Sequence, residues 1–425
     1  RKYGGAAFVL IYLLFLVLLG LPIMVMEFAV GRGSQASIAL SFDRLEPLGT
    51  KWHWYKWFGI GGNYLLMMFY TTIGGWLLLY TGKMAIGEFK GLDADGVTGV
   101  FTSLLGQPVT MTICMILVVV LCFGIVCMGL QKGVEQITKK MMILLFVLMI
   151  ILAVRSVTLP GAEKGLEFYL LPDFKKAAEA GLKEVIFAAM GQAFFTLSLG
   201  IGAIAIFGSY IGKERTLTGE AVCVTVLDTL VALIAGFIIF PACFAFNVQP
   251  DSGPSLIFIT LPNVFQQAFS GVPILAYIFS VMFYALLAMA ALTSTISLHE
   301  VVTAYLHEEF NLSRGKAARL VTGGCVFLGI FCSLSLGVMK GFTVFGLGMF
   351  DLFDFVTAKI MLPLGGLCIS LFTGWYLDKK IVWSEITNDG SLKVPVYKLI
   401  IFILKYIAPI AISLIFINEL GLIKL

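Results

Sequence analysis

Long apolar runs separated by short polar segments dominate the chain. A helix of about 20 apolar residues crosses the roughly 30 Å hydrocarbon layer of a bilayer, so these runs predict about ten transmembrane helices. Several runs are longer than that, which predicts tilt or extension beyond the bilayer. The pattern predicts an all-α polytopic membrane protein with a single domain, residues 1–425. The predicted spans are 6–31, 57–82, 108–128, 135–157, 184–211, 217–246, 274–306, 317–337, 350–377 and 395–421.

The fifth predicted span contains a polar, glycine-rich interruption. The stretch AFFTLSLGIGAIAIF (193–207) places Thr196, Ser198, Gly200 and Gly202 inside an apolar run. Each glycine costs a helix about 1 kcal/mol relative to alanine, and a broken helix in hydrocarbon leaves backbone groups unpaired. Close packing of small residues between helices is one explanation. The other is a discontinuous helix whose freed backbone binds a solute and a cation, as in transporters.

Polar side chains also interrupt three other spans at similar depth. Tyr70 lies in the second, Asp228 in the sixth, and the triplet 293–295 (Thr-Ser-Thr) in the seventh. Hydroxyls can simply bond a carbonyl one turn earlier, and Tyr70 could be a packing residue. A carboxylate in a membrane needs a partner or a cation, and hydroxyl, carboxylate and carbonyl oxygens suit a small alkali cation. Together the four spans predict one shared site in an ion-coupled carrier of a small solute.

Composition and charge support the membrane assignment and orient the chain. The sequence is 59% hydrophobic and only 13% charged, whereas about a quarter of a soluble domain is charged. Lys and Arg recur at every second loop, so the positive-inside rule predicts that these loops are cytoplasmic and that Arg1 is outside. The segment 155–183 fits least, because it carries both signs. The basic segments are 32–56, 129–140, 213–215, 314–319 and 379–380.

An N-terminus outside the membrane without a signal peptide predicts that a preceding span is missing from this sequence. The extracellular segment 247–273 has no Lys or Arg and is rich in Pro and Gly, so we expect short surface helices that form a lid.

Other function classes find little support in the sequence. Eight cysteines in apolar segments and three histidines predict neither a disulfide framework nor a zinc or histidine-based metal centre. The net charge of +4 is scattered, which argues against nucleic acid as a partner. There is no nucleophile elbow and no pair of intramembrane aspartates, so an enzyme is not expected. A channel remains an alternative to a carrier, although a lid and gates favour alternating access.

Five motifs occur in an order that resembles the neurotransmitter:sodium symporter family, particularly its bacterial eleven-span amino-acid transporters. The resemblance extends from residue 3 to about residue 421, and its motifs are YGGAAF (3–8), MEFAVGR (26–32), GQAFFTLSLGIGA (191–203), LTSTIS (292–297) and FDLFDF (350–355). It implies two inverted five-helix repeats whose first and sixth helices are unwound around a substrate and two sodium ions. This chain begins just after the first of those helices would end. An N-terminally truncated, inactive remnant is therefore the alternative to a working carrier.

The resemblance assigns the substrate site residue by residue. Tyr70 would bind the substrate carboxylate and Phe195 would cover the substrate. Ser198 and Gly200 lie in the unwound segment beside Thr196. The side-chain pocket would be lined by Leu66, Ile201 and Leu298. The resemblance implies sodium-coupled symport of an amino acid across the cytoplasmic membrane, and the apolar lining favours a small neutral, hydrophobic or aromatic one.

The resemblance also assigns two sodium sites. Thr196 and Asp228 match ligands of the first, and Ala290 (carbonyl), Thr293 and Ser294 match ligands of the second. The family usually has asparagine where this chain has Asp228. A resident carboxylate could replace the chloride that some relatives require, which predicts chloride-independent transport. Alternatively, Asp228 takes up a proton during the cycle and couples counter-movement of H⁺.

Gating and supporting roles complete these expectations. Asp354 matches the acidic member of the outer gate, and Gln192 is also assigned to gating. At the inner gate, Glu308 matches the acidic position and Tyr210 is expected to support it. Glu27 resembles a glutamate that holds the unwound backbone, while interfacial anchoring is the other explanation for its motif. His299, for which no role is expected, is predicted to be a hydrogen-bonded helix residue.

Overall fold

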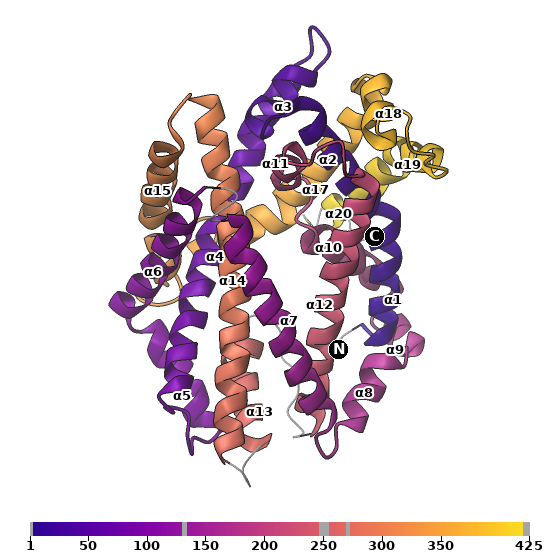
Figure 1. The fold of residues 1–425 in the computed structure, drawn as a ribbon. Helices are drawn as coiled ribbons and strands as arrows, with labels where there is room; N and C mark the ends of the chain where they lie inside the picture. Colours follow the sequence, from indigo (N-terminus) through magenta and orange to yellow (C-terminus); the bar gives the residue numbers. More distant parts are fainter. Residues whose placement is uncertain (1–2, 130–133, 246–254, 269–272, 420–425) are drawn as a thin grey trace.

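The computed structural model describes residues 3–129, 134–245, 255–268 and 273–419. Within these ranges the chain is helical or loop, and its β-type pairings are two isolated bridges. Most of the long helices run roughly along one direction, as Figure 1 shows. This arrangement agrees with the predicted all-α polytopic architecture.

The helices of the first half begin with a span in three pieces, and a short helix precedes the longest early span. Their bounds are α1 Ala6–Phe15, η1 Leu16–Gly20, α2 Leu21–Ser34, α3 Ile38–Leu45, η2 Trp52–Trp54, α4 Tyr55–Ala85, α5 Ala94–Leu105, α6 Pro108–Cys127, α7 Gln136–Val157, α8 Glu163–Leu170, α9 Phe174–Glu179, α10 Leu182–Thr196 and α11 Ala203–Ser209.

The second half contains the longest helix of the chain and ends in two spans with π-helical turns. Its elements are α12 Leu217–Ala245, η4 Leu256–Thr260, α13 Leu261–Ala268, α14 Pro273–Glu309, α15 Arg314–Leu334, α16 Met349–Asp354, η5 Phe355–Met361, α17 Leu362–Leu371, η6 Phe372–Tyr376, α18 Lys379–Thr387, α19 Tyr397–Phe402, η7 Ile403–Ile407 and α20 Ala408–Glu419.

Among the described residues, nine helical segments are long and apolar enough to cross a membrane. They correspond to nine of the ten predicted spans. The remaining predicted span, 184–211, is divided between α10 and α11, each too short to cross alone. The predicted count therefore agrees with the structure once the broken span is included.

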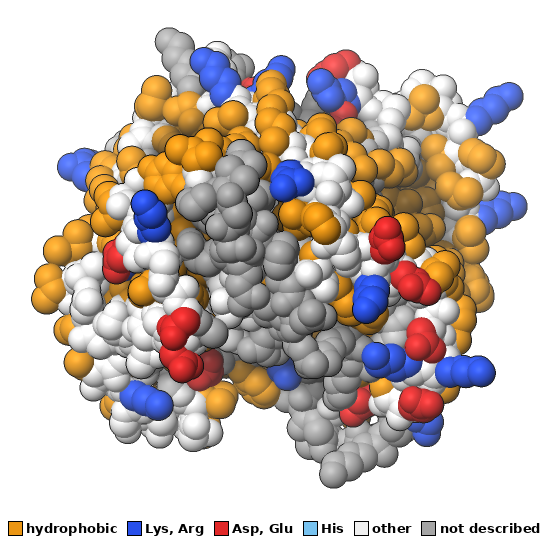
Figure 2. All heavy atoms as spheres, turned by 90° about the horizontal axis from the view of Figure 1, so that it is seen from below, with side chains coloured by type: hydrophobic (Ala, Val, Ile, Leu, Met, Phe, Trp, Pro, Cys, Tyr) orange, Lys and Arg blue, Asp and Glu red, His pale blue; other side chains and the backbone are white. Residues whose placement is uncertain are grey.

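The two ends of the bundle carry different connections. Figure 1 places α3, α11 and α18, with the basic loops, at one end and α5, α8 and α13 at the opposite end. The grouping of the basic loops at one end agrees with the predicted topology, in which every second loop lies on the same side of the membrane. At the second end, seen in Figure 2, acidic and basic side chains surround the face with hydrophobic ones between them. In the predicted lid segment, η4 and α13 are short helices as expected, while residues 246–254 and 269–272 lie outside the described part.

Close backbone approach positions the helices around the site. Helix α4 runs through the core, with Met67 and Trp76 fully or almost fully buried. It approaches α6 so closely that a Cβ on Gly75 would lie 2.8 Å from the Met115 amide nitrogen. In a bilayer, where lipid is as apolar as the helices, such van der Waals packing of small residues replaces the hydrophobic effect.

Candidate functional site

The candidate site is built around the interruption between α10 and α11. Residues 197–202 are not α-helical, and three of them have left-handed backbone angles: Ser198 (φ 51°), Gly200 (φ 94°) and Gly202 (φ 72°). A Cβ on Gly200 would overlap the Gly366 amide nitrogen and the Leu362 carbonyl of α17. The predicted break in the helix is confirmed. The glycines supply backbone conformations and close contacts that other residues could not.

Buried polar side chains satisfy the backbone that the break exposes. The Glu27 carboxylate of α2 is fully buried and accepts a hydrogen bond from the Gly200 amide at 3.2 Å. Tyr55 donates its hydroxyl hydrogen bond to the Gly200 carbonyl. Asn63, also fully buried, donates to the Ile201 carbonyl at 2.6 Å. Because unpaired backbone groups are costly in a membrane, these three side chains make the irregular segment possible.

The sequence analysis assigned a role to Glu27 but missed Tyr55 and Asn63. Asn63 did leave a signal, since it is an amide within an otherwise apolar predicted span. Tyr55 left none, because an aromatic residue at the start of a span is ordinary interfacial composition.

A cavity of about 440 Å³ lies against the break. It brings together residues from α4, α10, α12 and α14, which are distant in the sequence. The predicted residues in its wall are Leu66, Tyr70, Gln192, Phe195, Thr196, Ser198, Asp228, Ser294 and Leu298. Met24, Phe207 and Val224 also line it, and no sequence pattern singled them out.

Several predicted residues lie outside this wall. Ile201, expected in the side-chain pocket, is 1% exposed and packs against Gly62 of α4. Its position follows from the turn at 197–202, which directs the Ile201 carbonyl to Asn63 and the side chain into the core. The other predicted residues outside the wall are Glu27, Gly200, Tyr210, Ala290, Thr293, Glu308 and Asp354.

One pair of oxygen-bearing side chains from different helices meets beside the cavity. The Thr196 hydroxyl at the end of α10 donates to the Asp228 carboxylate of α12 at 2.8 Å. The pair is 32 residues apart in sequence. A hydroxyl and a carboxylate are hard donors of the kind that alkali cations prefer.

The second expected oxygen cluster lies within one turn of α14. The Thr293 and Ser294 hydroxyls donate to the Ala290 carbonyl at 2.9 and 3.1 Å. This is the ordinary back-bonding of helical Ser and Thr, and it also places three oxygens next to one another. The same geometry therefore suits both explanations that the sequence left open.

The end of the bundle that holds α3 and α11 contains a buried acid to which the sequence patterns assigned no role. Tyr210 was expected to support the inner gate, and its hydroxyl donates to Glu300 of α14 at 3.1 Å. Glu300 is fully buried and pairs with the Arg314 guanidinium at the start of α15. Glu308 accepts hydrogen bonds from the Ser37 amide and hydroxyl, at 2.8 and 2.6 Å. Glu300 had left the same signal as Asp228, a carboxylate within a predicted span.

Removal of the Arg314 cation is expected to destabilise this end strongly. In Arg314→Ala the fully buried Glu300 carboxylate loses its counter-charge, so we expect the free energy of unfolding in detergent to fall by about 3–5 kcal/mol. Chemical unfolding followed by tryptophan fluorescence measures it. Arg215→Ala is the matched control, because its pair with Glu220 is exposed and is worth at most about 1 kcal/mol. Equal losses in the two variants would contradict the interpretation.

Asp354 and His299 lie outside the cavity wall. Asp354 is the last residue of α16. His299 is buried in α14 and hydrogen-bonded, with ring nitrogens 3.0 and 3.1 Å from the hydroxyls of Thr322 and Thr303. His299 therefore has partners within the core, as expected.

One group of potential metal-ligand atoms lies near α3, where no metal centre was expected. Ligand atoms of Asp43, Glu46 and His53 lie within 4.8 Å of one another. Lys56 already places its ammonium nitrogen 3.2 Å from Asp43. Burial raises the pKa of Glu46, but hydrogen bonds from His53 and its charge outweigh burial, so the pKa of Glu46 is lowered overall. The cluster is thus a self-paired surface network.

Comparisons with known proteins agree with this architecture. The profile of the Sodium:neurotransmitter symporter family matches residues 99–424. The uncharacterized sodium-dependent transporter YhdH of Bacillus subtilis is 36% identical over 422 residues, covering 99% of this chain and 91% of that protein. A second uncharacterized sodium-dependent transporter, from Haemophilus influenzae, is 32% identical and covers 98% of this chain and 91% of its own length.

A solved structure shares the fold. The crystal structure of MhsT in complex with L-phenylalanine superposes with a TM-score of 0.87 at 40% identity, covering 98% of this chain and 92% of MhsT. The protein is accordingly a multi-pass integral membrane protein with the inverted-repeat transporter fold. The relatives are transporters, and several are named as sodium-dependent. On these grounds the chain belongs to the sodium:neurotransmitter symporter family.

Proposed function

We propose that the protein couples the movement of Na⁺ to that of a small neutral, hydrophobic or aromatic amino acid. The observation that carries this proposal is the broken helix α10–α11, which opens its backbone beside a cavity lined by oxygen-bearing and apolar side chains. Tyr70 offers a hydroxyl for a carboxylate, and Leu66 and Leu298 offer an apolar wall. MhsT, the structural neighbour, is named as a complex with L-phenylalanine.

Two ion positions are proposed, with Na⁺ as a transported substrate. Thr196 and Asp228 would hold one ion, and Ala290, Thr293 and Ser294 the other. Both clusters offer uncharged or anionic oxygen atoms and no soft ligand. Ion and amino acid would favour one access state over the other, and that difference in affinity couples the two movements. Phe195, in the cavity wall, would close over the substrate.

Chloride is not expected to be required. Asp228 supplies a negative charge beside the first ion position, where an anion would otherwise be needed. Chloride-stimulated uptake by the unaltered protein would argue against this. Uptake driven by an outward proton gradient would instead support H⁺ exchange at Asp228.

Sodium-dependent uptake in proteoliposomes tests the proposal. Twenty radiolabelled amino acids are screened with an inward Na⁺ gradient and, as control, with K⁺ in place of Na⁺. We expect Na⁺-dependent accumulation of hydrophobic or aromatic amino acids. Among the described residues of the cavity wall only Asp228 is charged, and it is assigned to the ion, so no wall residue is left to pair with a charged substrate side chain. Accumulation that ignores Na⁺, or that favours charged amino acids, would contradict the proposal.

The second ion position has its own test. In the double variant Thr293→Ala with Ser294→Ala, two of three proposed oxygen ligands are lost, so uptake should lose its steep dependence on Na⁺ concentration. Thr295→Ala is the matched control, because its hydroxyl bonds to Ala291 in the same helix and is fully buried away from the cavity. An unchanged Na⁺ dependence in the double variant would remove these residues from the ion site.

A further inference from the structure

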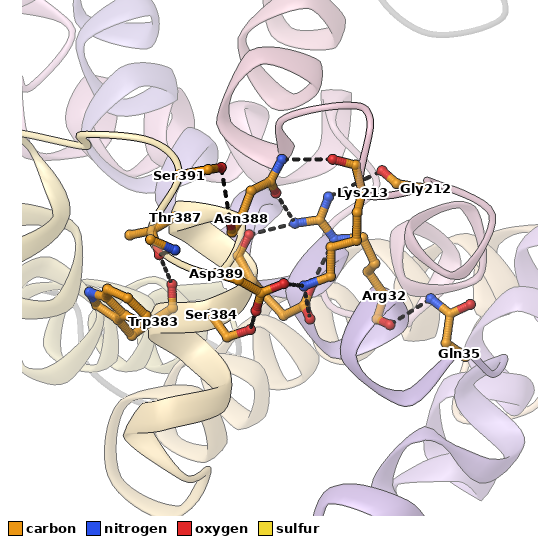
Figure 3. A network of polar contacts seen from close by, with 12 residues as sticks. Arg32, Gln35, Gly212, Lys213, Trp383, Ser384, Thr387, Asn388, Asp389 and Ser391 are labelled. Atoms are coloured by element: carbon orange, nitrogen blue, oxygen red, sulfur yellow. Dashed lines mark hydrogen bonds and ion pairs between the residues drawn. The ribbon is translucent and has the colours of Figure 1, made fainter.

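The cytoplasmic end of α2 carries a buried arginine with an unusually complete set of partners. The Arg32 side chain is fully buried. Its guanidinium donates to the Glu385 carboxylate at 2.6 Å, the Glu385 carbonyl at 2.5 Å and the Asn388 side-chain oxygen at 2.7 Å. It also donates to the carbonyls of Arg215 and Gly212, at 2.9 and 3.4 Å. We call this set of contacts the Arg32 cluster (Figure 3).

Neighbouring side chains tie the same three segments together again. The Lys213 ammonium lies 2.9 Å from the Glu385 carboxylate and 3.4 Å from that of Asp389. Asn388 returns two hydrogen bonds, to the carbonyls of Lys213 and Arg215. The Arg32 cluster therefore joins α2, the loop after α11 and helix α18, as Figure 3 shows.

Helix α18 is seated directly on α2. A Cβ on Gly33 would lie 3.3 Å from the Ile381 side chain and 3.5 Å from that of Glu385. Val382 and Ile386 of α18 are buried in the hydrophobic cluster that contains the α2 side chains. The small residue at 33 lets the two helices approach, so polar and apolar contacts hold α18 to the same place.

The connections of α18 to its own chain neighbours are irregular. Leu377 before it is extended, with ψ 139°. After it, Asn388, Asp389 and Gly390 have φ of 46°, 57° and 86°. These non-helical connections interrupt rigid helical continuity on both sides, between η6 and α18 and between α18 and α19.

Helix α11 approaches α2 even more closely than α18 does. A Cβ on Gly31 would overlap the Ala205 carbonyl, and one on Gly208 would lie 2.6 Å from the Phe28 carbonyl. On the N-terminal side of α11, Glu27 accepts a hydrogen bond from the Gly200 amide. On its C-terminal side, Arg32 donates to the carbonyls of Gly212 and Arg215. The short α11 is thus clamped to α2 at both ends.

We propose that α18 moves with α2 and α11 as one rigid body when the protein changes between its access states. The Arg32 cluster is the joint, meaning the contact that keeps the three helices together. If α18 stayed behind, the fully buried guanidinium would have to leave the Glu385 carboxylate, the Glu385 carbonyl and the Asn388 side-chain oxygen at once. Uncompensated buried charge is strongly unfavourable, so the joint stays closed. The extended backbone at Leu377 and the segment between Gly390 and the start of α19 absorb the movement. The inference rests on the ion-driven cycle of the proposed function.

Pulsed electron paramagnetic resonance distances on the full protein test this. Spin labels are placed at Trp383→Cys on α18 with Glu214→Cys in the loop after α11, or with Arg319→Cys on α15, all at exposed positions. The background carries Cys127→Ala and Cys223→Ala, which removes the two exposed thiols. Between Na⁺ and K⁺ we expect the 383–214 distance to stay constant and the 383–319 distance to shift by about 2–5 Å, as helices do in switching transitions.

Variants of the joint separate coupling from stability. In Glu385→Gln the carboxylate charge that Arg32 and Lys213 share is lost, so the 383–214 distance should broaden and become ion-dependent. Asn388→Ala is the second variant if Glu385→Gln fails to fold, and Lys379→Gln, an exposed change on α18, is the control. A role in stability alone would lower the melting temperature and leave the distance pattern of the unaltered protein.

Three outcomes overturn the inference. They are an ion-dependent 383–214 distance in the unaltered joint, a constant 383–319 distance, and an unchanged pattern in both joint variants. Uptake measured on the same labelled protein separates failure of this inference from failure of the proposed function. Na⁺-dependent uptake with a failed distance pattern removes this inference alone, whereas uptake that ignores Na⁺ removes the proposed function.

Discussion

Replacement of Asp228 by alanine is expected to abolish Na⁺-dependent uptake at limiting Na⁺. The carboxylate accepts a hydrogen bond from Thr196 and faces the cavity, so it is the anionic partner of the first proposed ion. A charge pair 4 Å apart near a protein surface is worth about 4 kcal/mol, and each 1.4 kcal/mol is about tenfold in affinity. We therefore expect the apparent Na⁺ affinity to fall by at least about tenfold, measured as the Na⁺ concentration for half-maximal uptake.

Asparagine at the same position sharpens this prediction. Asp228→Asn keeps the shape and one oxygen but removes the charge, so its Na⁺ affinity should also fall and its residual uptake should rise with chloride. Glu220→Gln is the matched control on the same helix, because Glu220 pairs with Arg215 away from the cavity. If Asp228→Ala retained the Na⁺ affinity of the unaltered protein, Asp228 would not be an ion ligand.

Replacement of Gly200 by alanine is expected to lower stability and substrate binding together. Gly200 has φ 94°, and a Cβ added to it would overlap the backbone of α17. A left-handed conformation costs an L-residue about 1–2 kcal/mol, and overpacking costs about 1–3 kcal/mol more. Because folded proteins are stable by only about 5–15 kcal/mol, this variant should melt at a much lower temperature and lose substrate binding. Thermal unfolding and binding of a radiolabelled substrate measure the two effects.

A second glycine separates the two costs. Gly87 has a similar backbone angle, φ 76°, but nothing lies within 4 Å of an added Cβ. Gly87→Ala should therefore show only the conformational cost and keep substrate binding. A Gly200→Ala protein as stable as Gly87→Ala would mean that the 197–202 segment can move away from α17.

Local patterns in the sequence predict most of the fold. Apolar run length predicts nine continuous spans, because each helix satisfies its own backbone and needs only apolar side chains to cross a membrane. The glycines Gly200 and Gly202 predict that the tenth span is broken, because glycine is used where the backbone must adopt a conformation that other residues disfavour. The recurrence of Lys and Arg at every second loop predicts that α3, α11 and α18 lie at the same end of the bundle.

The candidate site is only partly predictable in this way. Asp228 stands out because a carboxylate in an apolar run is costly, and Glu300 carries the same signal. The pattern does not say which helix supplies the partner, so the contact between the Tyr210 hydroxyl and Glu300 could not be predicted. Ile201 was expected in the cavity wall, but the turn that contains it directs its side chain into the core.

By itself, the sequence determined the helices, their topology and the place where one of them breaks, because these depend on residues close together along the chain. The tertiary structure alone decided which polar groups meet. Thr196 reaches Asp228 across 32 residues and Arg32 reaches Glu385 across 353. The physical reason is that a buried charge or a freed backbone group is costly without a partner in a membrane interior, and packing of distant helices determines which partner such a group meets.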